Sequence, residues 1–239
     1  DAYGIKVENV SVDFKKNIQR SRDISNRLSK GIEFLMKKNK ITHITGIGKL
    51  TSKTSLEVKN KQKTDTIEAE KIILATGARP KSFPGMEFDG NRVISFKEAM
   101  ILDSPPKKMV IIGSGAIGSE FAYYYNEFGT EVHLIEVMDR ILPVEDSDVS
   151  KEVAKSFKKS GIIISTETKV SKIESLKTKV KVHTEKNGKE EILEGDVALL
   201  AVGVTGNIEN IGLEELGIIT DRGAITINEF NQTNIPNIY

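Results

Sequence analysis

MVIIGSGAIGSEFAYYYNEFGTEVHLIE, residues 109–136, has the pattern of a strand, a glycine-rich turn, a helix and a second strand that ends in an acid. The residues before the turn, MVII, are apolar and mostly β-branched, as in a strand buried on both faces of a parallel sheet. A helix is predicted over residues 116–128, because Gly129 is suited to end it. The stretch therefore predicts a strand–helix–strand unit that binds a nucleotide.

Three glycines, Gly113, Gly115 and Gly118, give the turn the spacing G-x-G-x-x-G. The first glycine permits a tight turn, the second lets the backbone approach a pyrophosphate, and the third lets the helix lie close to the strand. The start of the helix adds free N–H groups and a partial positive charge, both of which favour phosphate. The turn is therefore predicted to bind a dinucleotide.

Two acids near this turn are candidate binding residues. Glu136 ends the second strand, where a carboxylate accepts hydrogen bonds from the adenosine ribose and repels a 2′-phosphate, which favours NAD over NADP. The alternative is that Glu136 only caps the strand. Glu120 lies on the first turn of the helix, where a carboxylate suits the helix dipole, and helix stabilisation alone is the alternative there.

The composition excludes several classes of protein. The 239 residues carry a formal net charge of +1, so no electrostatic attraction to nucleic acid is expected. No apolar run reaches the roughly 18 residues of a membrane-spanning helix, and no secretory signal is visible. Cysteine is absent, and His43, His133 and His183 lie far apart, so no metal site or catalytic triad is predicted. These features favour a soluble, intracellular protein.

The remaining pattern predicts an α/β protein with a tandem arrangement. KIILATGARP (71–80) and VALLAVGVTGN (197–207) are both apolar strands that break at a glycine after a β-meander, which suggests two related nucleotide domains. The paired prolines at 105 and 106 suggest a domain boundary. The apolar run TNIPNIY at the end suggests a segment of a longer chain. Helices are predicted over 14–38, 147–161 and 214–216, strands over 41–52, 72–75, 162–165, 197–202 and 224–227, and a hairpin turn at Asn187-Gly188.

Several segments of the chain resemble segments of the flavin-dependent pyridine nucleotide–disulfide oxidoreductases. They are the glycine turn, ILATGARP, VHLIEVMDRILP, LLAVGVTGNIENIGLEELGI and TNIPNIY. The resemblance covers nearly the whole chain and is strongest to the members that oxidise dihydrolipoamide. It implies two tandem Rossmann-like domains, each with three layers, a parallel sheet and a β-meander. By this comparison residues 1–104 are the later part of an incomplete FAD-binding domain, 105–226 the NAD-binding domain, and 227–239 the start of the return to the FAD domain.

The resemblance also assigns binding residues. It implies that Glu120 lies near the nicotinamide and the flavin, and that Val170 and Gly203 contact NAD through their backbones. Val204 departs from the family, since many relatives carry arginine in a G-R-x-P-N stretch there. The implied NAD contacts are Gly113, Ser114, Gly115, Ala116, Ile117, Gly118, Glu120, Glu136, Val170 and Gly203, and the implied FAD contacts are Gly48, Thr76, Gly77 and Ala78.

The resemblance implies a homodimeric enzyme that oxidises dihydrolipoamide on the lipoyl domain of a 2-oxo acid dehydrogenase complex, with FAD and NAD⁺ as cofactors. The family's redox C-x4-C pair would precede Asp1, and its acid–base His–Glu pair would follow Tyr239. No catalytic residue is therefore expected within these residues. Two alternatives stay open: another disulfide reductase of the family, acting on glutathione, trypanothione or mercuric ion, and a non-catalytic NAD-binding module. Glu136 argues against the reductases that use NADPH.

Overall fold

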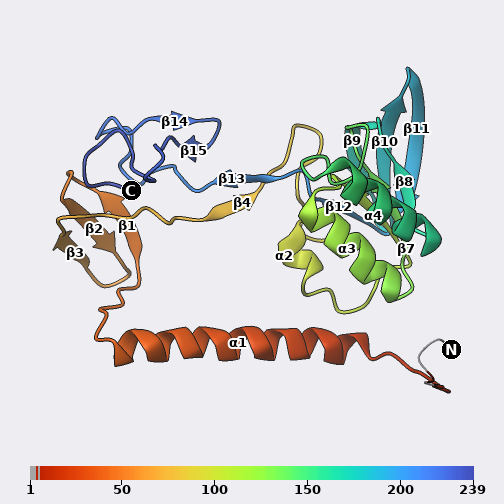
Figure 1. Ribbon diagram of the computed structural model, residues 1–239, viewed down its shortest axis with the longest axis horizontal. Coiled ribbons are helices and arrows are strands. Elements are labelled where there is room, and N and C mark those ends of the chain that lie inside the picture. Colours follow the sequence, from red (N-terminus) through yellow and green to blue (C-terminus); the bar gives the residue numbers. More distant parts are fainter. Residues whose placement is uncertain (1–3, 5) are drawn as a thin grey trace. The chain divides into compact units, whose positions relative to one another are not determined.

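Two compact units make up the chain in the computed structural model, which describes Gly4 and residues 6–239 (Figure 1). The first unit contains the described residues up to Arg27 together with Pro80–Gly203, and the second contains Leu28–Arg79 and Val204–Tyr239. The predicted first helix is confirmed as α1 (Phe14–Lys38), whose sequence is divided between the units. The units have other bounds than the FAD and NAD segments expected from the sequence, and that division stays a prediction.

A five-stranded parallel sheet forms the centre of the first unit. Its order is β5-β12-β6-β7-β8, so β6 lies in the middle with its sequence neighbour β7 on one side and β12 on the other. The predicted strand–helix–strand–helix–strand order is confirmed. The elements are β5 (Val93–Ile94), α2 (Phe96–Ala99), β6 (Lys108–Ile112), α3 (Ala116–Glu127), β7 (Glu131–Ile135), α4 (Ser147–Lys159), β8 (Ile163–Ser165) and β12 (Val197–Leu200).

Both faces of this sheet are covered. Because side chains alternate along a strand, Met109 and Ile111 of β6 enter the core on the helix side, and Val110 and Ile112 enter the core on the other side. That second core lies against an antiparallel meander whose hairpin turn contains Asn187 and Gly188, both with positive φ. The α/β class with three layers is therefore confirmed for this unit. The meander consists of β9 (Lys169–Ser175), β10 (Val180–Lys186) and β11 (Lys189–Gly195).

The second unit is built from short strands around a small core. Three of them form an antiparallel sheet, β4 pairs with β13, and β14 pairs with β15. The core comprises Leu50, Ile72, Leu213, Ile218 and Ile238. The strands are β1 (Ile47–Leu50), β2 (Ser55–Lys59), β3 (Thr64–Glu68), β4 (Ala78–Pro80), β13 (Val204–Gly206), β14 (Thr220–Asp221) and β15 (Ala224–Ile225).

Two predicted elements of this unit are wrong. Residues 72–75 form no full strand. Ile72 and Leu74 exchange backbone hydrogen bonds with residues 237–239, but only Ile72 and Ile238 form a parallel bridge. Residues 214–216 form a turn instead of a helix, since Gly212 (φ +87°) and Gly217 (φ +68°) leave room for only one turn between them. The strand expected over 41–52 is limited to β1.

Candidate dinucleotide-binding site

A cavity of about 870 Å³ lies in the first unit, at the carboxyl ends of the central strands. Ile112 at the end of β6 and Ile135 at the end of β7 line it, as does Ala201 just after β12. The chain reverses its direction of winding at β6, and ligands of open α/β sheets bind outside the strand ends at such a point. The cavity therefore occupies the position that the fold favours for a ligand.

The glycine turn forms one wall of this cavity, and its glycines have different surroundings. A Cβ on Gly113 (φ +94°) would lie 2.5 Å from the carbonyl oxygen of Ala201, and a Cβ on Gly118 would lie 1.9 Å from the carbonyl oxygen of Gly113. A Cβ on Gly115 would meet nothing within 4 Å. Gly113 and Gly118 thus hold the turn against its neighbours, whereas Gly115 faces the space that a pyrophosphate would need.

The start of α3 points to an anionic ligand at the same place. Gly115 is the N-cap residue of α3, and no side chain caps the helix there. The next two residues, Ala116 and Ile117, also line the cavity. The backbone N–H groups of a first helical turn have no partner within the helix, and the helix dipole adds positive charge. The turn therefore has the chemistry of a phosphate site, which fits the pyrophosphate of NAD.

Glu136 borders the cavity next to the glycine turn. Glu136 is among the lining residues, although it is only 6% exposed. Its Oε2 accepts hydrogen bonds from the N–H (2.9 Å) and the hydroxyl (2.7 Å) of Ser114, and its Oε1 accepts one from the N–H of Met138 (3.0 Å). No sequence pattern indicates these internal bonds. The position of Glu136 fits both roles considered for it: the carboxylate caps the end of β7, and the residue also borders the cavity.

The structure brings most of the predicted NAD residues to one cavity. The turn, Glu136, Val170 and Gly203 all contribute to its lining, while Ser114 and Gly118 are buried just behind it. Sequence reasoning missed the rest of the lining. It comes from a loop with no binding motif, from β9 and the residue before it, and from apolar residues at the ends of β6, β7 and β12, so no local pattern marks it. The missed lining residues are Phe83, Pro84, Met86, Ile112, Ile135, Val137, Thr168, Lys169, Ser171, Ala201 and Val202.

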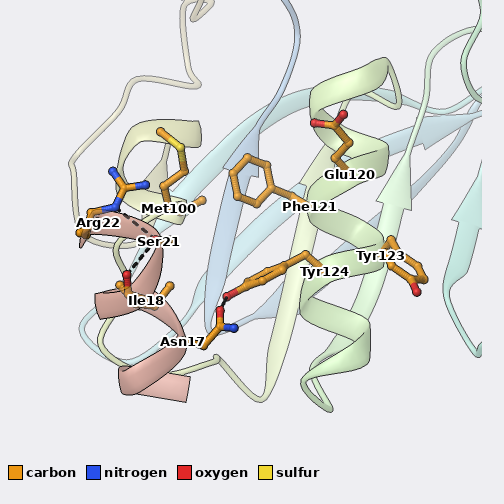
Figure 2. Close-up of a pocket in the computed structure, with 10 residues that line it drawn as sticks. Asn17, Ile18, Ser21, Arg22, Met100, Glu120, Phe121, Tyr123 and Tyr124 are labelled. Carbon is orange, nitrogen blue, oxygen red and sulfur yellow. Dashed lines mark hydrogen bonds between the residues drawn. The ribbon is translucent and has the colours of Figure 1, made fainter. Parts of the chain in front are cut away.

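Glu120 lies in a different cavity, of about 440 Å³, also within the first unit (Figure 2). Arg22 of α1, Met100 at the end of α2 and Phe121 of α3 share this second cavity with Glu120. Tyr124 borders it too, and its hydroxyl donates a hydrogen bond to Oδ1 of Asn17 (2.9 Å). Glu120 is therefore absent from the lining of the dinucleotide cavity, and its role beside the nicotinamide and flavin stays a prediction.

The residues assigned to FAD lie in the second unit and line neither cavity. Asn207 holds the backbone at two of them. Its N–H donates to the carbonyl oxygen of Gly77 (3.0 Å), and its Nδ2 donates to that of Thr76 (3.1 Å). Gly77 has φ +72°, which favours glycine at this position. Gly48 lies in β1 and Ala78 begins β4, and the FAD contacts of all four residues stay a prediction.

Two of the three histidines lie in strands beside other side chains, and His43 is exposed. His133 is buried in β7 with its Nε2 2.8 Å from the hydroxyl oxygen of Ser165, and burial, together with the charge of Lys108, lowers its pKa. The Nε2 of His183 lies 3.2 Å from a carboxylate oxygen of Glu174. No group of side chains suited to hold a metal ion occurs among the described residues. Across the same residues, no helix combines the length and the apolar character needed to cross a membrane.

Comparison with protein families gives one match along this chain. The model of the family described as "Pyridine nucleotide-disulphide oxidoreductase" matches residues 4–239. The dihydrolipoyl dehydrogenase of Rhizobium etli is 41% identical over 254 residues, which cover 99% of this chain and 53% of the relative. The dihydrolipoyl dehydrogenase of Bacillus subtilis is 36% identical over 250 residues, which cover 100% of this chain and 53% of the relative.

Two solved structures are also similar to this chain, each over about half of its own length. LpdA of Mycobacterium tuberculosis is similar with a TM-score of 0.88 and 26% identity, over 96% of this chain and 51% of that one. The HOCl-induced flavoprotein disulfide reductase RclA of Escherichia coli is similar with a TM-score of 0.81 and 27% identity, over 95% of this chain and 52% of that one. The chain thus spans about half the length of the curated relatives that it matches.

Proposed function

Because the chain belongs to the pyridine nucleotide-disulphide oxidoreductase family, we propose that it is the NAD-binding part of a flavoprotein that oxidises dihydrolipoamide. The observation that carries the nucleotide assignment is the position of Glu136, a carboxylate at the edge of the cavity that begins at the phosphate-binding turn. A carboxylate there accepts a ribose hydroxyl and repels a 2′-phosphate. The two curated relatives, both named dihydrolipoyl dehydrogenase, suggest the substrate.

In this proposal the residues of the chain position NAD⁺. The turn from Gly113 to Gly118 binds the pyrophosphate through backbone N–H groups, Glu136 orients the adenosine ribose, and Gly203 lines the same cavity. Gly48, Thr76, Gly77 and Ala78 would hold FAD, which would supply two-electron transfer between the dithiol and NAD⁺. The sequence has no cysteine, so the redox disulfide of the enzyme comes from outside these residues.

The setting of the enzyme is part of the same proposal. Its substrate is the lipoyl group on the lipoyl domain of a 2-oxo acid dehydrogenase complex, and its full-length form is a homodimer. The cytoplasm, or the mitochondrial matrix in a eukaryote, is where such a complex operates. These statements rest on the names of the relatives and on the resemblance of the sequence.

The test uses the full-length, FAD-loaded enzyme with dihydrolipoamide, and follows NADH by its absorbance. Turnover with NAD⁺ and little turnover with NADP⁺ are expected. Turnover with NADPH and glutathione, trypanothione or mercuric ion, but none with dihydrolipoamide, would identify another reductase of the family. Nucleotide binding without turnover on any of these substrates would identify a non-catalytic module.

A variant pair connects this activity to the site. Glu136→Ala is expected to weaken NADH binding by about 1–3 kcal/mol, because a hydrogen bond to a charged group is lost. Glu131→Ala is the matched control, since Glu131 begins the strand that Glu136 directly follows, but is exposed, and its side chain pairs with Lys108. Calorimetry measures both affinities. An unchanged affinity in Glu136→Ala would remove Glu136 from the site.

A further inference from the structure

The carboxylate of Glu136 is held by more protein donors than a ribose-binding acid requires. Ser114 supplies two of the three, its N–H and its hydroxyl, and both reach Oε2. The N–H of Met138 reaches Oε1. Ser114 is 0% exposed and Glu136 6% exposed, so these bonds lie in the interior behind the cavity wall. The carboxylate is therefore fixed before any nucleotide binds.

The number of donors limits what the carboxylate offers to a ligand. A carboxylate has about four acceptor positions, two on each oxygen. Ser114 fills both positions on Oε2, and Met138 fills one on Oε1. One position on Oε1 is left for a bound nucleotide. Glu136 is therefore set to accept a hydrogen bond from one ribose hydroxyl.

We propose that Ser114 determines the preference for NAD over NADP by keeping Glu136 at the cavity wall. This role rests on the proposed binding of NAD. A 2′-phosphate is anionic and has no donor to offer, so NADP binds only if the carboxylate moves away. Such a movement would leave two buried donors of Ser114 without a partner, which is unfavourable. Ser114 is thus a positioning residue that acts on the ligand through Glu136.

The chain contains a matched control for this role. Ser119 is also buried, and its hydroxyl donates to the carbonyl oxygen of Ser114 (3.0 Å) instead of to Glu136. Ser114→Ala and Ser119→Ala each remove one buried hydroxyl from the same turn and helix. If Ser114 only stabilises the fold, the two substitutions should change the affinities for NADH and NADPH to a similar extent. A specificity role predicts an effect of Ser114 on the ratio of the two affinities.

The experiment measures the dissociation constants of NADH and NADPH with the full-length, FAD-loaded enzyme. Ser114→Ala is expected to weaken NADH binding and to lower the preference for NADH by about tenfold, the size of one hydrogen bond to a charged group. Ser119→Ala is expected to keep the wild-type preference. Ser114→Gly removes the same hydroxyl together with the Cβ, and is expected to behave as Ser114→Ala does if the hydroxyl is what matters. Thermal unfolding of each variant reports whether it folds.

A double substitution tests whether the effect passes through Glu136. In a Glu136→Gln background the preference for NADH is already reduced, and Ser114→Ala is expected to change it no further. If Ser114→Ala and Ser114→Gly change both affinities by equal factors, or leave both unchanged, the proposed role of Ser114 is wrong while the proposed function stands. A wild-type enzyme that binds NADPH as tightly as NADH contradicts both.

Discussion

Gly115 and Gly118 lie three residues apart in one turn, yet the space around them differs sharply. A Cβ at position 118 would lie 1.9 Å from the carbonyl oxygen of Gly113, which is backbone and cannot rotate away. A Cβ at position 115 would enter open space, and Gly115 has φ −65°, which alanine adopts without strain. We therefore expect a methyl group at position 118 to affect folding, and a methyl group at position 115 to affect ligand binding.

Two alanine substitutions test this separation. Gly118→Ala is expected to lower the free energy of unfolding by about 1–3 kcal/mol, because the added carbon must displace backbone. Gly115→Ala is expected to leave that free energy near the wild-type value but to weaken NADH binding, since its methyl group occupies ligand space. Urea unfolding and calorimetry on the full-length enzyme measure the two quantities. Equal losses of stability in both variants would contradict the assignment.

The sequence predicts the glycines of the turn better than it predicts the contacts of the two acids. The three glycines follow from the spacing alone, because each meets a requirement of one tight turn and its helix. The bonds between Ser114 and Glu136 could not be predicted, since they join positions 22 residues apart and depend on the direction of a side chain. The placement of Glu120 in a separate cavity depends likewise on which side of α3 faces α1 and α2. The sequence thus predicts where the site lies better than it predicts the bonds within it.

At the scale of elements, one aspartate organises the loop that leads into β5. Asp89 accepts hydrogen bonds from the N–H groups of Asn91 (2.8 Å), Arg92 (2.7 Å) and Val93 (2.9 Å). It also accepts one from the hydroxyl of Ser175 at the end of β9. Partial burial raises the pKa of the Asp89 carboxyl, but these four bonds outweigh burial and lower the pKa to about 2. The charged form of Asp89 is therefore favoured by the fold.

Asp89→Asn is expected to destabilise the first unit in a pH-dependent way. The folded pKa is about 2 and the ordinary value is 3.8, so the charged carboxylate stabilises the fold above about pH 4. That contribution is lost as the pH falls through about 2, and the difference between wild type and variant should shrink with it. Urea unfolding at pH 7 and at pH 3 measures the difference. Asp139→Asn, at an exposed acid 3.7 Å from Arg140, is the control, and an equal effect there would contradict the role of Asp89.

An apolar run in the sequence predicts a strand correctly only where neighbouring strands are present to pair with it. The residues of β6 and those at 72–75 are both apolar runs and both predict a buried strand. β6 lies between two parallel neighbours, and its residues Met109, Val110 and Ile111 are 0% exposed. Ile72 and Leu74 hydrogen-bond only with the short segment 237–239, and the residue between them, Ile73, is 78% exposed. Strand formation depends on non-local pairing, which an apolar run does not report.

At the scale of the whole molecule, the predicted nucleotide contacts fall into separate units. The NAD residues belong to the first unit, and the FAD residues Gly48, Thr76 and Gly77 belong to the second. Sequence patterns suggested two nucleotide domains, and the family resemblance suggested which binds which cofactor. The bounds of the units at Arg79 and Gly203 could not be predicted, because they follow from three-dimensional contacts that include the pairing of β4 with β13.

This separation predicts how the two cofactors protect the backbone. A bound ligand stabilises the native state and slows hydrogen exchange most where it contacts the chain. Adding NADH to the full-length, FAD-loaded enzyme is expected to slow exchange at the turn 113–118 and around Glu136 and Gly203. Exchange at residues 76–78 is expected to stay as it was. Removing FAD is expected to speed exchange at 76–78. Mass spectrometry of exchanged peptides measures all of these segments in one experiment.

The Gly115→Ala variant is the control for this experiment. At an NADH concentration about 100-fold above the wild-type dissociation constant, a bound ligand adds about 2.7 kcal/mol of stability. The variant should show less of this protection at 113–118, and the wild-type response to FAD at 76–78. Protection by NADH at 76–78 as strong as that at 113–118 would mean that the second unit also responds to NADH, and the assignment of one cofactor to each unit would be wrong.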